Sequence, residues 1–122
     1  MDDFSVSHER ERGCEVVALA GELDIDTTYT ARATLEPLVD EGEGPIVVDL
    51  SGVGFVDSTA IAMLVTMRRK LREAGRGFAI VGQTGPVGRL FALTGLEQEL
   101  GLVATRDAAF DAVGAGSASG QA

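Results

Sequence analysis

Residues 45–64 read PIVVDLSGVGFVDSTAIAML, and this stretch decides the fold class. Its first six residues are a short apolar run bounded by glycines, which is typical of a central strand covered on both faces. From Ser58 to about Ala74 apolar residues recur at helical spacing, so a helix is expected there. A buried strand followed directly by an amphipathic helix indicates an α/β layer structure.

The flanking segments predict further elements of the same kinds. Runs at residues 4–9 and 15–21 predict a hairpin. Residues 27–42 predict a helix capped by Thr27 or Asp26, with Pro37 expected to kink or shorten it. Two more strands are expected at 78–82 and 102–105, and two short helices at 86–95 and 107–113. The predicted fold is a single α/β domain with a mixed β-sheet of four to five strands and about four α-helices.

The length and composition favour one globular domain. A chain of 122 residues with 45% hydrophobic content can bury a single core, which we place in residues 1–113. Residues 114–122, GAGSASGQA, are small or polar and are expected to form a disordered tail. Because no apolar run approaches the ~18–20 residues of a membrane span and the first residues are acidic, we expect a cytoplasmic protein without a membrane partner.

The net charge of −9 is unevenly distributed. Residues 1–50 hold 13 acidic and 3 basic residues, whereas residues 51–122 hold 6 acidic and 7 basic residues. Nucleic-acid binding depends on Lys and Arg that neutralise phosphates, so we expect no nucleic-acid partner. The basic segment MRRKLR, residues 67–72, is interpreted as a set of cations near a helix end, where they complement the helix dipole.

Metal and cofactor sites are not expected. The single cysteine, Cys14, cannot form an internal disulfide, and the single histidine, His8, lies in a different polarity pattern. Glu22, Asp24 and Asp26 in GELDIDT are a possible divalent-cation site, but solvated loop acids are the favoured interpretation because no second oxygen cluster follows at a recognisable spacing.

A hydrolase with Ser58 as nucleophile and His8 as base is a distant alternative. The sequence around Ser58 is VDSTA and lacks the GxSxG elbow, and His8 falls on the polar side of a strand. The glycines of residues 82–88 do not have the spacing of a phosphate loop. We therefore expect no catalytic residue in this chain.

The junction of strand and helix carries three capping residue types side by side, namely Asp57, Ser58 and Thr59. One such side chain is enough to satisfy an orphan amide at a helix start. The residues alone leave two interpretations open: a redundant cap, or a functional site whose hydroxyls serve another purpose.

Four motifs occur in a specific order, and together they resemble the STAS domain, in particular the anti-sigma factor antagonist family. They are the GELD turn, DLSGV after the central strand, FVDST at the helix start, and GPVGRLFALTGLE further on. The resemblance covers the chain to about Val113. It implies an anti-sigma factor antagonist that releases a sigma factor for transcription.

The resemblance also assigns site residues. Ser58 occupies the position of the serine that the partner anti-sigma factor, a serine/threonine kinase, phosphorylates in that family, and Thr59 takes the second hydroxyl place. ATP would belong to the kinase, and a phosphatase would reset Ser58. The expected partner-binding residues are Glu22, Asp24, Asp57, Ser58, Thr59, Ala60 and Met63, with Met63 partly exposed.

The sequence departs from the family pattern at Ala60 and Ala62, where glycines are common in the family. Alanine favours a helix over glycine by about 0.8–1 kcal/mol, so the helix start is stiffer. The Ala60 methyl is expected to lie near the approaching partner. The alternative function is a non-phosphorylated STAS binding module, for a small ligand or as part of a larger regulatory or transport complex, with Ser58 only a cap.

Overall fold

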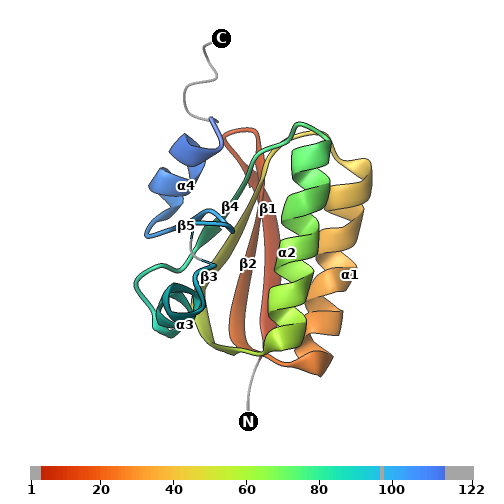
Figure 1. Cartoon of the computed structure of the whole chain (residues 1–122). Helices are drawn as coiled ribbons and strands as arrows, with labels where there is room; N and C mark the ends of the chain where they lie inside the picture. Colours follow the sequence, from red (N-terminus) through yellow and green to blue (C-terminus); the bar gives the residue numbers. More distant parts are fainter. Residues whose placement is uncertain (1–3, 97, 115–122) are drawn as a thin grey trace.

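The computed structural model describes residues 4–96 and 98–114, which form a five-stranded sheet with the order β1-β2-β3-β4-β5. β1 pairs antiparallel with β2, and the other three pairs are parallel. The predicted mixed sheet is thus confirmed, with the segment after Gly44 as its middle strand (Figure 1). The strands are β1 (Ser5–Glu11), β2 (Cys14–Leu23), β3 (Ile46–Val56), β4 (Phe78–Val81) and β5 (Leu102–Val103).

Four helices connect or follow the strands. α1 (Ile25–Glu41) and α2 (Ser58–Glu73) lie side by side on one face of the sheet (Figure 1). α3 (Pro86–Thr94) contributes Val87 and Phe91 to the same core. α4 (Arg106–Ala112) covers part of the opposite face.

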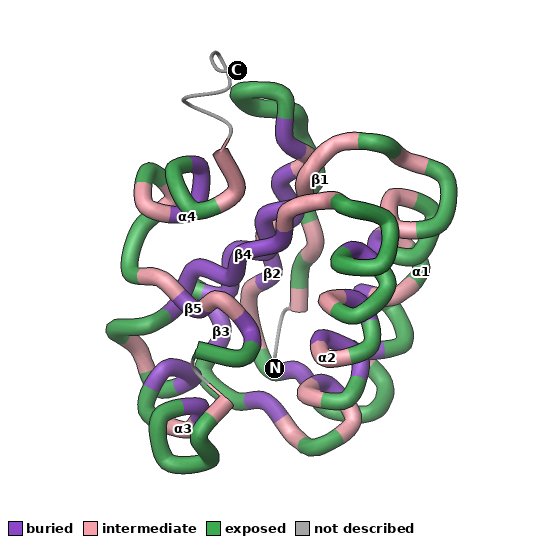
Figure 2. Tube along the Cα trace, turned by 45° about the horizontal axis from the view of Figure 1, so that its top comes forward, coloured by how far each residue is buried: buried purple, intermediate pink, exposed green. Residues whose placement is uncertain are grey.

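Alternation along the strands divides the buried residues into two cores. In β3, Ile46 and Val48 point toward α1 and α2, whereas Val47 points toward Phe110 of α4. Burial on both faces explains why this segment is continuously apolar. The inner strands are mostly buried and the edge strand β1 is largely exposed (Figure 2).

β3 extends six residues beyond the strand predicted from its apolar run, to Val56. The pairing with β2 continues to the pair Leu23–Val56, with irregular register on the way. Gly52 is needed in this part, because a Cβ there would lie 3.0 Å from the Cβ of Ala20 on β2. Because β3 is longer than predicted, α2 begins at the same end of the sheet as α1.

The first helix differs from its prediction in where it begins and in the effect of Pro37. It begins at Ile25 with Asp24 as the N-cap, earlier than the predicted cap at Asp26 or Thr27. Pro37 does not shorten the helix, which continues to Glu41. The carbonyl that Pro37 leaves without a donor belongs to Ala33, which is exposed and therefore accessible to water.

The predicted tail of residues 114–122 lies outside the described residues except for Gly114. No helix in the described ranges is long and apolar enough to cross a membrane.

Candidate functional site

The starts of α1 and α2 meet at one edge of the sheet, which we call the helix-start edge and define as residues 22–26 and 55–59. The backbone N–H of Asp57 donates to the carbonyl of Leu23 at 3.0 Å. Glu22 and Phe55 are register partners in the neighbouring strands. The pairing therefore brings the predicted residues Glu22, Asp24, Asp57, Ser58 and Thr59 to the same edge of the molecule.

Asp57 caps α2 by itself. Its Oδ1 accepts hydrogen bonds from the backbone N–H of Thr59 at 2.9 Å and of Ala60 at 3.1 Å. Two of the amides that a helix start leaves unpaired are thus satisfied by one carboxylate. A further cap from Ser58 or Thr59 is not required.

Ser58 is the first residue of α2 and is exposed. Its hydroxyl forms no hydrogen bond with any residue of the described ranges, and neither does that of the half-buried Thr59. The interpretation of Ser58 as a cap is therefore wrong. Its hydroxyl is presented to solvent from a rigid helix start.

Several carboxylates share the helix-start edge with this hydroxyl. Glu22, Asp24 and Asp26 are all exposed, and Asp24 caps α1. Hydrogen bonds from the backbone N–H and then the hydroxyl of Thr27 hold the pKa of Asp24 below its usual range. Within the described ranges no group of three or more His, Cys, Asp or Glu side chains is arranged to hold a metal ion.

The helix-start edge also carries exposed apolar side chains, which the sequence analysis missed. Phe55 is 49% exposed and Ile25 66% exposed, and Tyr29 lies one turn further along α1 at 76%. Phe55 breaks the burial alternation of β3, because it and Gly54 are both exposed between the buried Val53 and Val56. Large apolar residues on an exposed edge are typical of a protein interaction surface.

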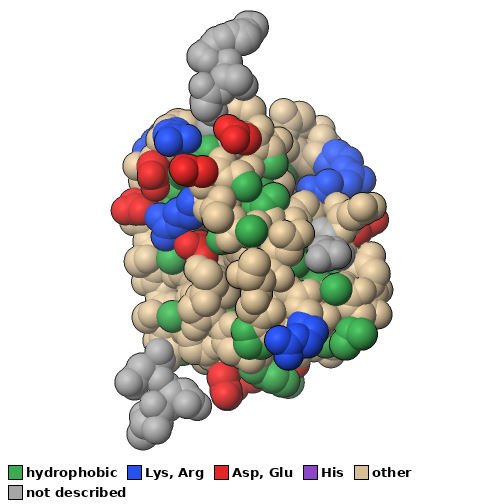
Figure 3. Space-filling model, turned by 90° about the vertical axis from the view of Figure 1, so that its left-hand side faces the viewer, with side chains coloured by type: hydrophobic (Ala, Val, Ile, Leu, Met, Phe, Trp, Pro, Cys, Tyr) green, Lys and Arg blue, Asp and Glu red, His purple; other side chains and the backbone are tan. Residues whose placement is uncertain are grey.

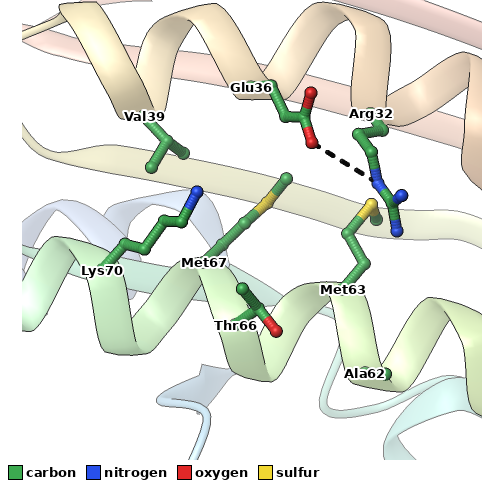
Figure 4. Close-up of a pocket in the computed structure, with 8 residues that line it drawn as sticks. All are labelled: Arg32, Glu36, Val39, Ala62, Met63, Thr66, Met67 and Lys70. Carbon is green, nitrogen blue, oxygen red and sulfur yellow. Dashed lines mark ion pairs between the residues drawn. The ribbon is translucent and has the colours of Figure 1, made fainter.

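Two of the predicted partner-binding residues are buried. Met63 is 3% exposed, so its predicted partial exposure is wrong. It lies with Met67 in a groove of about 250 Å³ between α1 and α2, beside the ion pair of Arg32 with Glu36 (Figure 4). The buried face of α2 consists of Ala60, Met63, Leu64, Met67 and Leu71.

Ala60 is fully buried, so its methyl group points into the core and not toward a partner. The expectation that this methyl lies near an approaching partner is therefore wrong. Ala62 is exposed and lines the outer part of the groove between the two helices. The departure from the family pattern at residue 60 leaves the surface around Ser58 unchanged.

The arrangement needed for a hydrolase does not form. His8 lies opposite Val17, six residues before the end of β2, which is about 20 Å of strand away from the helix-start edge. Its Nε2 lies 2.6 Å from Oε1 of Glu15. The imidazole is engaged far from Ser58.

Asp49 of the DLSGV motif lies on the other face of the sheet and holds α4 in place. It is 8% exposed and accepts from Nε of Arg106 at 2.8 Å and from the backbone N–H of Ser51 at 2.9 Å. Burial raises the pKa of Asp49, but the hydrogen bonds from Ser51 and Arg106 outweigh it and the net direction is downward. Arg106 also pairs with Glu9 of β1, on a face where acidic and basic side chains intermingle (Figure 3).

Comparisons with known proteins agree with this geometry. Residues 6–104 match the family model described as MlaB, STAS domain. The chain is 33% identical over 81 residues to the anti-sigma-B factor antagonist of Staphylococcus epidermidis, covering 66% of this chain and 75% of that protein. It is 31% identical to a solved anti-sigma factor antagonist from Mycobacterium paratuberculosis, with 91% and 94% of the two chains covered and a TM-score of 0.76.

The chain therefore belongs to the STAS-domain anti-sigma factor antagonist family. The fold is shared with SpoIIAA, which has been solved in an unphosphorylated form at 22% identity, 89% and 94% coverage and a TM-score of 0.70. A phosphorylated form of the Bacillus protein matches at 21% identity, 89% and 97% coverage and a TM-score of 0.66. The family is regulatory by the names of these relatives, in line with the expectation of a non-enzymatic protein.

Proposed function

We propose that this chain, when unphosphorylated, binds an anti-sigma factor through the helix-start edge and thereby releases a sigma factor for transcription. Phosphorylation of Ser58 by the anti-sigma factor, acting as a serine kinase, switches this binding off, and a phosphatase restores it. The observation that carries the proposal is the exposed hydroxyl of Ser58, which no capping role occupies because Asp57 caps α2 alone.

The position of Ser58 suits a phosphoacceptor. A hydroxyl on the first residue of a helix is held at a fixed place by the helix and remains accessible from outside. The positive end of the helix dipole tolerates a phosphate there, so the domain itself need not unfold or rearrange. Phosphorylation then changes the binding of the partner and not the fold of the domain.

The charge change explains why phosphorylation would oppose binding. A phosphate adds about −1.5 to −2 charges at pH 7 to an edge that already carries Glu22, Asp24 and Asp57. A serine that accepts a phosphate from ATP must face the nucleotide phosphates in the complex, so phosphoserine meets like charge there. Repulsion and the cost of desolvating the added charge both weaken the complex.

The apolar residues around the edge supply the attractive part of the interaction. Phe55 and Ile25 are exposed among the acidic residues of this edge, and aromatic anchors contribute much of the energy in typical interfaces. The proposed contact surface therefore combines Glu22, Asp24, Asp57, Ser58 and Thr59 with these two apolar residues.

The test compares the affinities of three variants for the cognate anti-sigma factor, after circular dichroism shows each to be folded. Ser58→Asp is expected to bind at least about tenfold more weakly than wild type, and Ser58→Ala to bind normally. Ser7→Asp adds the same charge on the exposed strand β1 and serves as the matched control, with no expected change. Equal affinity of Ser58→Asp and wild type would contradict the switch.

The alternative is a STAS module that binds a partner or ligand without phosphorylation. It predicts that Ser58→Asp and Ser58→Ala behave alike, and that the cognate kinase with ATP adds no phosphate. The burial of Ala60 removes one argument for this alternative, since the alanine does not change the exposed surface beside Ser58.

A further inference from the structure

Three arginines on α2 have no ion-pair partner among the described residues: Arg68, Arg69 and Arg72. This is unusual in a chain with a net charge of −9. The described cations that do have an ion-pair or carbonyl partner are Arg10, Arg12, Arg32, Lys70, Arg76 and Arg106.

Arg68 is the least satisfied of the three. It is half-buried, and its Nε atom is enclosed without a hydrogen-bond acceptor in the described part of the chain. An enclosed donor without an acceptor is destabilising. Arg68 and Arg72 are also four residues apart on one helix, where like charges repel. An anion bound between Arg68 and Arg72 would relieve this repulsion.

The helix dipole accounts for only part of this charge. Lys70 and Arg72 are in the last turn of α2, where cations are favourable. Arg68 precedes that turn, and its guanidinium instead reaches toward the loop before β5. Its Nη1 lies 3.4 Å from the position that a Cβ on Gly101 would take, so glycine leaves room for it.

A hollow of about 430 Å³ lies beside these arginines. Three guanidinium groups line it and, among the residues that the structure describes, no carboxylate does. Its size is within the range of small-molecule sites. The Arg76 guanidinium is held in place by the fold, because each of its three nitrogens donates to a carbonyl at 2.8–2.9 Å. We call it the arginine hollow and define it by Arg68, Arg72, Arg76, Gly77, Phe78 and Gly101.

We propose that the arginine hollow binds a small phosphorylated ligand, with Arg68 and Arg72 as the groups that hold the phosphate. Planar guanidinium groups bind phosphate oxygens in pairs, which suits two arginines on one helix face. A hollow of this volume suits a small ligand and not an extended nucleic acid. The site is separate from the helix-start edge, because Arg68 and Arg72 follow Ser58 on α2 by about three turns or more.

Arg69 provides a matched control. It lines a neighbouring hollow of about 260 Å³ together with Arg68, Arg72 and Glu99, and it does not line the arginine hollow. Both Arg69 and Arg72 are exposed, so replacing either with Gln removes one charge without disturbing the core.

The experiment measures pyrophosphate binding by isothermal titration calorimetry at constant ionic strength. Wild type is expected to bind, and Arg72→Gln and Arg68→Lys to bind about tenfold more weakly, whereas Arg69→Gln stays within about twofold of wild type. Absence of binding to wild type, or equal losses in Arg69→Gln and Arg72→Gln, would overturn the proposal.

A second arm separates a free ligand from a lipid headgroup. The protein is sedimented with phosphatidylcholine vesicles that contain or lack phosphatidic acid. Pyrophosphate binding without vesicle binding supports the small-ligand site. Binding to phosphatidic acid vesicles without pyrophosphate binding would assign the arginines to a membrane surface and overturn it.

Discussion

The two helices that begin at the same edge of the sheet use their hydroxyl groups in opposite ways. At α1, Asp24 and Thr27 form a reciprocal capping box: the Thr27 N–H donates to Asp24 Oδ1 at 3.0 Å, and the Asp24 N–H donates to the Thr27 hydroxyl at 2.9 Å. At α2, Asp57 caps alone and the Ser58 hydroxyl has no partner in the described ranges.

The difference distinguishes a structural hydroxyl from an available one. Thr27 also lies 2.5 Å from the carbonyl of Glu22, so its hydroxyl is fully used within the fold. In α2 the equivalent third position is Ala60, which has no hydroxyl and is buried in the core. The hydroxyl residues next to Asp57 are instead Ser58, at the exposed first position, and Thr59, at the half-buried second position. A hydroxyl in that place contributes little to stability, which leaves its chemistry free for a partner.

The largest expected effect concerns phosphorylation, because it is all or none. Incubation with the cognate kinase and ATP should add one phosphate to wild type and none to Ser58→Ala, as measured by intact mass. Thr59→Ala and Thr27→Ala should both still accept the phosphate, because both keep the Ser58 hydroxyl. Thr59 is half-buried, and the Thr27 hydroxyl is hydrogen-bonded within the fold. Phosphate incorporation into Ser58→Ala would contradict the assignment of Ser58 as the phosphorylated residue.

The second prediction concerns stability, to which the Thr27 hydroxyl is expected to contribute more than the Ser58 hydroxyl. Thr27→Ala should lower the free energy of unfolding by about 1 kcal/mol, because it removes half of a capping box and a hydrogen bond to Glu22. Ser58→Ala should change it by less than about 0.5 kcal/mol. Urea unfolding of both variants measures the difference. A larger loss in Ser58→Ala than in Thr27→Ala would show that the Ser58 hydroxyl has a structural role after all.

The third prediction concerns the residue that takes the place of Thr27 in α2. Ala60→Gly should lower the free energy of unfolding by about 0.8–1 kcal/mol through helix propensity, with some further loss from the buried methyl. Phosphate incorporation at Ser58, measured on folded protein, should not change, since the methyl does not reach the surface. A marked gain in phosphorylation rate would indicate that residue 60 contacts the kinase.

The sequence predicted most of the fold because its periodic segments are strong. β4 and α2 lie within a residue or so of their predictions, and the mixed sheet with its central strand is confirmed. The extension of β3 was missed because Gly52 and Gly54 interrupt the apolar pattern, while pairing with β2 holds the strand together. The start of α1 was misplaced because Asp24 and Thr27 are both capping types, and only coordinates show their reciprocal bonds.

The candidate site was less predictable. The motif order identified the family and singled out Ser58. That Asp57 caps α2 while the Ser58 hydroxyl is left without a bond in the described ranges depends on side-chain positions, which a sequence does not determine. Met63 was placed at the surface because the flank of α2 that faces α1 is decided by helix packing and not by hydrophobicity alone. The phosphorylation of Ser58 and the partner contacts stay predictions.

The smallest expected effect is a pH dependence confined to the α1 start. Because hydrogen bonds from Thr27 lower the pKa of Asp24 in the folded state, its carboxylate stabilises the fold at pH values above its unfolded pKa of about 3.9. That contribution is lost as the pH falls through the lower, folded pKa. Asp24→Asn keeps a capping side chain without the charge, so the small gap in stability between wild type and this variant should close on acidification. An NMR titration of the Asp24 carboxyl carbon gives the direct measurement, and Thr27→Ala should move the pKa part of the way back toward its usual value. A carboxyl that titrates normally in wild type would mean that the capping box does not favour the charged form, and the contrast between the two helix starts would then reduce to the hydroxyl groups alone.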